Sequence, residues 1–103
     1  MRKIPEELRA EMAGEKYYKK CCLCGSRPVQ WHHNLIYAGR QVNEKECILP
    51  ICEVCHNKAR NTEVREQLDL IMLTRMSPEQ MKKYSKAVDL FQRYKYLTAK
   101  YPL

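Results

Sequence analysis

Four of the six cysteines in this chain are spaced as ligands for a metal ion. Cys21 and Cys24 form one Cys-x-x-Cys pair, and Cys52 and Cys55 form a second. A structural zinc ion takes four thiolates in a tetrahedron at about 2.3 Å, and two tight turns that each present two sulfurs supply this set. We therefore predict one structural zinc ion bound by these four cysteines. Cys22 lies inside the first pair and is predicted to be packed or exposed rather than bound to the metal.

All three histidines lie between or directly beside these pairs. His32 and His33 are adjacent in the intervening segment, and His56 directly follows Cys55. Neighbouring residues of a regular strand point to opposite faces, so one of the two can bind a metal while the other addresses a water molecule, provided that the strand ends or bends there. A metal at Cys55 would also fix the direction of His56. Phosphodiester hydrolysis needs such a set, because it requires a base for water and a cation for the phosphorane and the departing oxygen.

Length, composition and charge limit the class of protein. The chain has 103 residues, of which 45% are hydrophobic and 30% charged, and its net charge is +7. This length predicts a single domain over residues 1–103, with a modest core that a structural metal would supplement. We expect neither a membrane span nor a secretory signal, and in a reducing compartment the cysteines are expected to be metal ligands rather than disulfides. The positive charge suits a polyanion such as nucleic acid.

Two extended segments and a helix are predicted around the histidines. Residues 28–33 alternate in polarity, and residues 46–51 are rich in Ile and Leu. The two segments are predicted to pair as an antiparallel ribbon, connected by a loop over residues 34–45. Pro50 must then lie at a strand end or an edge, because proline has no N–H to donate. A helix is predicted over residues 53–60.

Helices are also predicted on both sides of this central stretch. Residues 1–20 predict a short helix and a basic lead-in, and residues 62–100 predict a helical C-terminal extension. Asn61 can cap one of its helices, and Ser77-Pro78 with Gln80 predicts a capping box at the start of another. An apolar stripe at helical spacing follows and is predicted to be core. Its members are Met81, Tyr84, Val88, Phe91, Tyr94 and Leu97.

The central stretch resembles the HNH endonucleases. The resemblance rests on Trp31-His32-His33, a loop, and then Ile48-Leu49-Pro50-Ile51-Cys52-x-x-Cys55-His56-Asn57-Lys58, and it covers residues 21–60. These enzymes belong to the ββα-metal nucleases of phages, mobile elements and bacterial defence. The resemblance implies an α+β fold in which a zinc-stabilised ββα finger, an antiparallel ribbon plus a helix, carries additional N- and C-terminal helices. It also implies hydrolysis of DNA to a 5′-phosphate and a 3′-hydroxyl.

The resemblance assigns a role to each histidine. His33 matches the general base at the end of the first strand. His32 stands where the family often has an aspartate that binds the catalytic metal, and His56 matches the second protein ligand of that metal. The candidate ions are Mn²⁺, Mg²⁺, Ni²⁺, Co²⁺ and Zn²⁺. Because imidazole suits transition metals better than Mg²⁺, the histidine pair favours Mn²⁺, Co²⁺ or Ni²⁺ over Mg²⁺.

One position departs from the family pattern. The middle asparagine of the family, which braces the loop and orients the base, would fall at Cys47. Asn34 and Asn43 are the candidates to replace it. The predicted phosphate contacts are Arg40 in the loop and Lys58 and Arg60 on the finger helix.

The sequence therefore favours a metal-dependent HNH endonuclease that acts on DNA or, on charge alone, RNA, in the cytoplasm of a bacterial or phage-infected cell. Two other classes stay open. One is a zinc-stabilised nucleic-acid-binding module that has lost catalysis, which a cysteine at position 47 would fit. The other is a protein-interaction adaptor whose zinc is purely structural. Retention of all three histidines favours the enzyme, because a binding module has no need of them.

Overall fold

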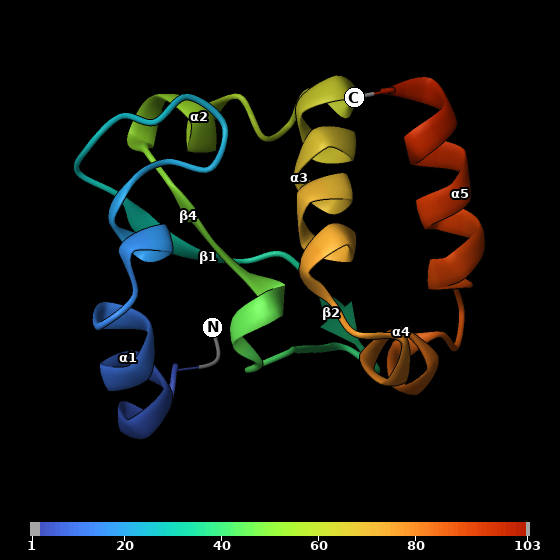
Figure 1. Cartoon of the computed structure of the whole chain (residues 1–103), viewed down its shortest axis with the longest axis horizontal. Helices are drawn as coiled ribbons and strands as arrows, with labels where there is room; N and C mark the ends of the chain where they lie inside the picture. Colours follow the sequence, from blue (N-terminus) through green and yellow to red (C-terminus); the bar gives the residue numbers. More distant parts are fainter. Residues whose placement is uncertain (1–2, 103) are drawn as a thin grey trace.

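Strands β1 (Gln30–His33) and β4 (Ile48–Ile51) lie at the centre of the molecule, with helices on either side (Figure 1). The computed structural model describes residues 3–102. The two strands pair antiparallel, with His32 opposite Leu49 and His33 opposite Ile48. This confirms the predicted ribbon. The second strand begins later than expected, because residues 45–47 form the short 3₁₀ helix η2 (Lys45–Cys47).

Every residue of β4 is buried, because the strand is covered from two sides. The 3₁₀ helix η1 (Lys16–Lys19) contacts it on one side, and α3 (Thr62–Arg75) contacts it on the other. Pro50 lies within β4 opposite Trp31. Its missing N–H is tolerated because a two-stranded sheet has only edge strands. On the edge of β4 that does not pair with β1, the carbonyl of Pro50 accepts a hydrogen bond of 2.9 Å from the backbone N–H of Cys22.

The connection between β1 and β4, predicted as a loop, contains a short hairpin. Strands β2 (Ile36–Tyr37) and β3 (Arg40–Gln41) pair antiparallel across Ala38 and Gly39. Both turn residues have positive φ, 52° and 77° respectively. A two-residue turn with positive φ at both positions matches the twist of the strands that it joins. The turn therefore favours the hairpin although the sequence of these strands shows no alternating apolar pattern.

Within the described part of the chain, each α-helix after β4 begins after a residue whose side chain caps the first turn, whereas the α-helix before β1 begins without a side-chain cap. Helix α1 spans Glu6–Ala13, and α2 (Glu53–Asn57) ends three residues before the predicted residue 60. It ends because the chain turns there to place Asn61, whose side chain accepts hydrogen bonds from two N–H groups at the start of α3. The predicted capping box of Ser77 and Gln80 is confirmed at the start of α4 (Pro78–Tyr84).

The prediction that the whole apolar stripe after residue 78 lies in the core is wrong. The chain leaves the helix after α4 and enters a second helix, α5 (Leu90–Lys100), so the two members of the stripe nearest the break, Val88 and Phe91, are exposed. Two side chains account for the break. Ser85 accepts a hydrogen bond of 2.9 Å from the N–H of Leu90, and Asp89 caps the first turn of α5. Such local side-chain bonds compete with helix continuation.

One core fills the space between the β1–β4 sheet and helices α3, α4 and α5 (Figure 1). Its fully buried members include Leu49 and Ile51 from the sheet, Leu68 and Leu73 from α3, and Leu97 from α5. A smaller cluster of Ile4, Met12, Tyr18 and Ile48 fixes the N-terminal segment to the opposite side of the sheet. Among residues 3–102, no helix is long and apolar enough to cross a membrane.

Candidate metal centre and histidine pair

The four cysteines predicted as ligands meet in space. The sulfur atoms of Cys21, Cys24, Cys52 and Cys55 all lie within 4.8 Å of one another, and those of Cys24 and Cys52 are 3.6 Å apart. Tetrahedral zinc–thiolate bonds of about 2.3 Å place sulfur atoms about 3.8 Å apart, so the donor set and its dimensions fit zinc. The cluster could therefore hold a metal ion such as zinc.

Two short turns fix these sulfurs. In the first, Gly25 adopts a φ of 77°, and its N–H donates to the carbonyl of Cys21 at 2.9 Å. A residue with a Cβ would be strained at this φ, so glycine follows the second ligand for a physical reason. In the second turn, Cys52 precedes α2, and its sulfur accepts a hydrogen bond of 3.5 Å from the N–H of Cys55. Each turn therefore presents two sulfurs at a fixed spacing.

The thiols of the cluster differ in their tendency to ionise. Hydrogen bonds from Ser26 lower the pKa of Cys24 to about 6, whereas burial, followed by the sharing of a proton with Cys52, raises the pKa of Cys55. Four thiolates at one point repel one another, and a bound divalent cation removes that repulsion. Cys22 is not a member of the cluster, and burial and then the charge of a neighbouring cysteine raise its pKa to about 12. It remains a neutral thiol outside the cluster, as predicted.

His32 and His56 come together from two different elements. His32 lies on β1 and His56 on α2, and their ring centroids are 5.5 Å apart with an interplanar angle of 70°. His32 is half-buried and His56 is exposed. Burial, followed by the charge of His56, lowers the pKa of His32. The ring of His32 is therefore held in its neutral form, in which one nitrogen keeps a lone pair for a cation.

A chain of polar side chains connects His32 to the C-terminal helices. Asn34 directly follows β1, two residues after His32, and its side chain interacts with His32. The amide nitrogen of Asn34 donates to Asp69 of α3 at 3.0 Å, and Asp69 forms an ion pair of 2.9 Å with Arg93 of α5. Sequence reasoning missed Asp69 and Arg93. The only signal in the sequence is the position of Asp69 between two leucines, Leu68 and Leu70.

The same polar chain lies beside a cavity of about 640 Å³. Asn34, Asp69 and Arg93 line one part of it, and the remaining walls include Leu35, Met72, Leu73 and Leu90. Tyr37 and Tyr84 also line it, and their rings meet edge to face at 5.2 Å. The cavity therefore opens between the β2–β3 hairpin and the C-terminal helices, on the His32 side of the sheet.

His33 lies on the opposite face of β1 and has a different partner. Its Nε2 is 2.6 Å from Oδ1 of Asn43. The amide nitrogen of Asn43 donates to the carbonyl of Lys3 at 3.1 Å, so the oxygen of this amide faces the histidine. An amide oxygen only accepts, and Nε2 must therefore carry the proton. The lone pair of neutral His33 is then on Nδ1, which leaves that atom as the proton acceptor.

The position expected for the family's asparagine belongs to the core. Cys47 has 0% of its surface exposed, and burial raises the pKa of its thiol to about 12. Its carbonyl accepts a hydrogen bond of 2.9 Å from the N–H of Asn34. Of the two asparagines considered as replacements, Asn43 contacts His33 and Asn34 contacts His32. Each histidine on β1 therefore has its own asparagine.

The three predicted phosphate contacts are exposed but are not gathered in one place. Lys58 and Arg60 follow α2, whereas Arg40 lies on β3, in the hairpin with β2. Figure 1 shows α2 and β2 at opposite ends of the molecule. The structure therefore does not bring Arg40 together with the other two.

Comparisons with protein-family models, with curated proteins and with solved structures find no match to this chain. The geometry of the site therefore has to carry the functional argument.

Proposed function

We propose that this chain is a metal-dependent HNH endonuclease that hydrolyses phosphodiester bonds of DNA. The observation that carries the proposal is the convergence of His32 and His56, whose rings lie 5.5 Å apart although they come from a strand and a helix. His56 directly follows Cys55, a member of the four-cysteine cluster. A metal in the cluster would hold α2, and with it His56, in place against β1.

The order of the elements supports the same proposal. β1 and β4 pair antiparallel, and α2 follows β4 directly. We interpret these three elements as the ββα finger of the family, with the β2–β3 hairpin inserted between its strands. Helices α3, α4 and α5 then form an extension that encloses the His32 side of the finger.

The histidine pair fits a second cation. Both donors are imidazoles, and the lowered pKa of His32 favours the neutral form that binds metal. His32 and His56 would hold this ion, with water and phosphate oxygens as its remaining ligands. When bound, a divalent cation supplies positive charge that stabilises the phosphorane and the departing oxygen.

His33 is the general base of the proposed reaction. Its Nδ1 accepts a proton from water, the resulting hydroxide oxygen bonds to phosphorus, and the bond from phosphorus to the 3′-oxygen breaks. The 3′-oxygen takes up a proton from solvent, which leaves a 3′-hydroxyl and a 5′-phosphate. Asn43 keeps the proton on Nε2 and thereby fixes which nitrogen acts.

Cleavage of supercoiled plasmid by the zinc-loaded protein tests this proposal. We expect nicked or linear product only when Mn²⁺, Co²⁺, Ni²⁺ or Mg²⁺ is added, and we expect DNA ligase to reseal the nicks, because ligation requires a 5′-phosphate and a 3′-hydroxyl. His56→Ala is the matched control, since it removes one ligand of the second ion and leaves all four cysteines. Cleavage that persists unchanged in His56→Ala, or products that ligase cannot join, would contradict the proposed site.

A nucleic-acid-binding module without catalysis is the second candidate. It is favoured by the placement of His33 on the face of β1 opposite to His32, which separates the proposed base from the proposed metal ligands. DNA binding by the wild type without cleavage in any of the four ions would select this candidate. A plasmid assay and a binding assay at one salt concentration together separate the two.

A further inference from the structure

A basic cleft lies next to the cysteine cluster. It has a volume of about 730 Å³ and runs between η1 and the turn that carries the first cysteine pair. Its lining residues are Lys16, Tyr17, Lys19, Lys20, Cys21, Cys22, Gly25 and Arg27. Four of these eight are cations and none is acidic.

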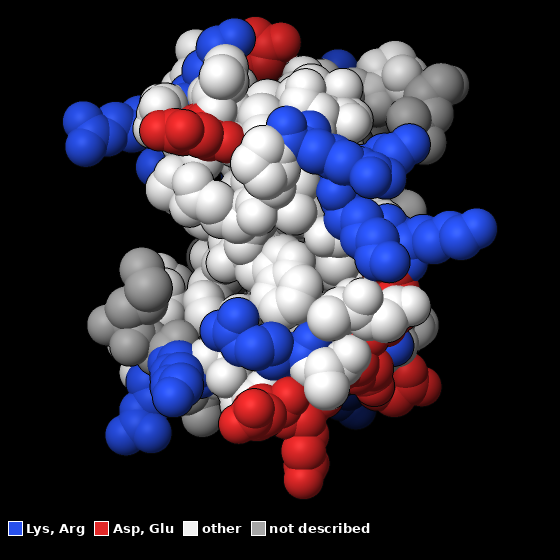
Figure 2. Space-filling model, turned by 90° about the vertical axis from the view of Figure 1, so that its left-hand side faces the viewer, with Lys and Arg blue, Asp and Glu red and all other residues white. Residues whose placement is uncertain are grey.

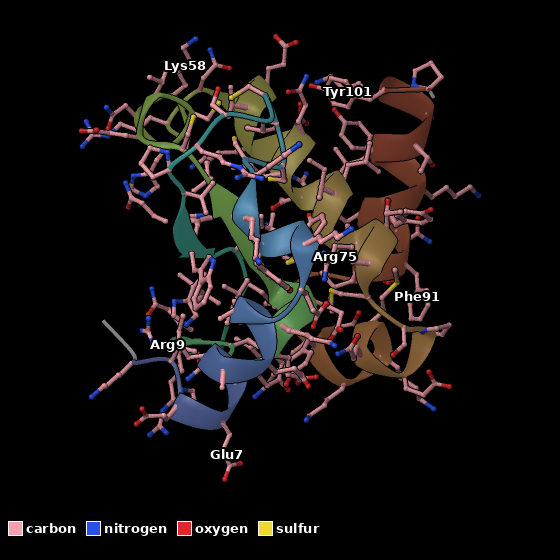
Figure 3. All side chains as sticks on the ribbon, turned by 60° about the vertical axis from the view of Figure 1, so that its left-hand side comes forward. Glu7, Arg9, Lys58, Arg75, Phe91 and Tyr101 are labelled. Atoms are coloured by element: carbon pink, nitrogen blue, oxygen red, sulfur yellow. The ribbon has the colours of Figure 1, made fainter. Side chains whose placement is uncertain are left out.

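The local structure sends the cations outward and the aromatic rings inward. In a 3₁₀ helix, residues three apart lie on the same side, so Lys16 and Lys19 project together from η1. Tyr18 is buried, and Tyr17 packs beneath the guanidinium of Arg75, which lies 3.7 Å from the centre of its ring. Figure 3 shows Arg75 reaching from α3 towards η1. The tyrosines therefore anchor the segment, and the lysines remain free to contact a ligand.

Among the described residues, the cations of the cleft have no carboxylate partners, whereas several cations elsewhere in the molecule do. Lys45 pairs with Glu15 at 3.0 Å, Lys100 with Glu66 at 2.8 Å, and Arg93 with Asp69 at 2.9 Å. Within residues 3–102, Lys16, Lys19, Lys20 and Arg27 form no such ion pair, and all four are exposed. Figure 2 shows Lys and Arg side chains gathered on the upper right of one face, and acidic side chains along its lower edge.

The positive charge of the cleft is larger than the negative charge of the neighbouring cysteine cluster with a divalent ion bound. Four thiolates with one divalent ion carry a net charge of about −2. The four cations of the cleft more than balance this charge and leave an excess of about two positive charges. Cys21 is a member of both the cluster and the cleft wall, so a bound metal would also make this wall rigid. A rigid, net positive groove with no acidic lining suits the phosphate backbone of a nucleic acid.

We propose that the cleft lined by Lys16, Lys19, Lys20 and Arg27 binds the phosphate backbone of the DNA that the histidine pair cleaves. This inference rests on the proposed nuclease function for the identity of the polyanion. It assigns substrate binding to the basic lead-in on the N-terminal side of the cysteine cluster rather than to the three predicted phosphate contacts Arg40, Lys58 and Arg60. Lys58 lies at the same end of the molecule as the cluster, at the end of α2 (Figure 3), and extends the positive surface there.

The test compares two triple variants of equal charge. The cleft variant is Lys16→Gln/Lys19→Gln/Lys20→Gln. The control is Lys82→Gln/Lys86→Gln/Lys95→Gln, three exposed lysines on the C-terminal helices and their connection that form no ion pair within residues 3–102. Binding of a fluorescein-labelled duplex by the zinc-loaded protein is followed by anisotropy, without added divalent metal, from about 50 to about 200 mM salt.

Each phosphate contact contributes about 0.9 to the slope of log K against log salt, so loss of three contacts should lower the slope by about 2 to 3 and the affinity at least about 10-fold. The control should retain most of the slope. A third variant with arginine at Lys16, Lys19 and Lys20 keeps the charge and should bind like the wild type. Zinc content and circular dichroism check that each variant is folded.

Three outcomes would overturn the proposal. Equal losses in the cleft and control variants would mean that only overall charge matters. Normal DNA binding with reduced zinc content would mean that the lysines serve the cluster alone. Wild-type salt dependence in the cleft variant would remove the cleft from the interface. Plasmid cleavage by the wild type is scored separately, so binding through the cleft without any cleavage would refute the nuclease and keep the cleft.

Discussion

The two faces of strand β1 give adjacent histidines different surroundings. On one face, His32 meets His56 and is joined through Asn34 to Asp69 of α3. On the other face, His33 bonds to Asn43, which is fixed in turn by the backbone near the N-terminus. Identical side chains one residue apart therefore have different partners. The two-residue period of the strand places the two histidines in different environments.

Removal of zinc should produce the largest effect, because it affects both faces at once. Structural zinc sites in small domains contribute about 10 kcal/mol or more of apparent binding free energy. We expect a chelator at neutral pH to release one zinc ion per chain and to unfold the region around β1, with loss of near-ultraviolet circular dichroism. Re-addition of zinc should restore the signal. A protein that contains no zinc, or that keeps its spectrum after prolonged chelation, would show that the cluster does not hold the two faces together.

Substitution of His33 by alanine should affect the reaction and spare binding. General-base catalysis contributes about 10²- to 10⁴-fold, so plasmid cleavage should fall by a factor in that range. DNA affinity should change little, since it depends chiefly on contacts of Lys and Arg with phosphate. Cleavage and binding are measured at one fixed salt concentration. Equal cleavage by the variant and the wild type would remove His33 from the mechanism.

The two asparagines provide a matched pair of substitutions, one for each face. Loss of a partner behind a metal ligand typically weakens metal affinity by about 10- to 100-fold, and we expect Asn34→Ala to do so. Asn43→Ala should leave metal affinity unchanged but lower cleavage by a comparable factor, because His33 can then adopt the unproductive tautomer. Calorimetric titration of the zinc-loaded proteins with Co²⁺ reports affinity, and the plasmid assay reports cleavage. The same phenotype from both variants would break the distinction between the faces.

Replacement of His32 by aspartate should have the mildest effect, a change of metal preference rather than a loss of activity. The wild type is expected to need less Mn²⁺, Co²⁺ or Ni²⁺ than Mg²⁺, because both protein ligands are imidazoles. An oxygen ligand at position 32 should move the preference towards Mg²⁺. The measurement is the concentration of each ion that supports half-maximal cleavage. A wild type that works best in Mg²⁺ would show that His32 is not a ligand.

The local chemistry of this protein could be predicted from its sequence. Two Cys-x-x-Cys pairs fix the spacing of four sulfurs, so the cluster follows from the turns themselves. The caps at Asn61 and Ser77 are equally local, because each side chain bonds to N–H groups within three residues of it. The pairing of β1 with β4 also followed from composition, since two short apolar segments beside one cluster have few other partners.

Only the tertiary structure decided which side chains accompany the histidines. Asn43 and Asn34 were both candidates, and neither lies in β1 or β4, so only the path of the chain between the two strands brings each one to its own histidine. Asp69 and Arg93 reach the site from helices far along the chain, and the break before α5 depends on Ser85 and Asp89 bonding to the chain that follows them. Such contacts join residues that are distant in sequence or depend on a single side-chain bond, and neither leaves a periodic pattern.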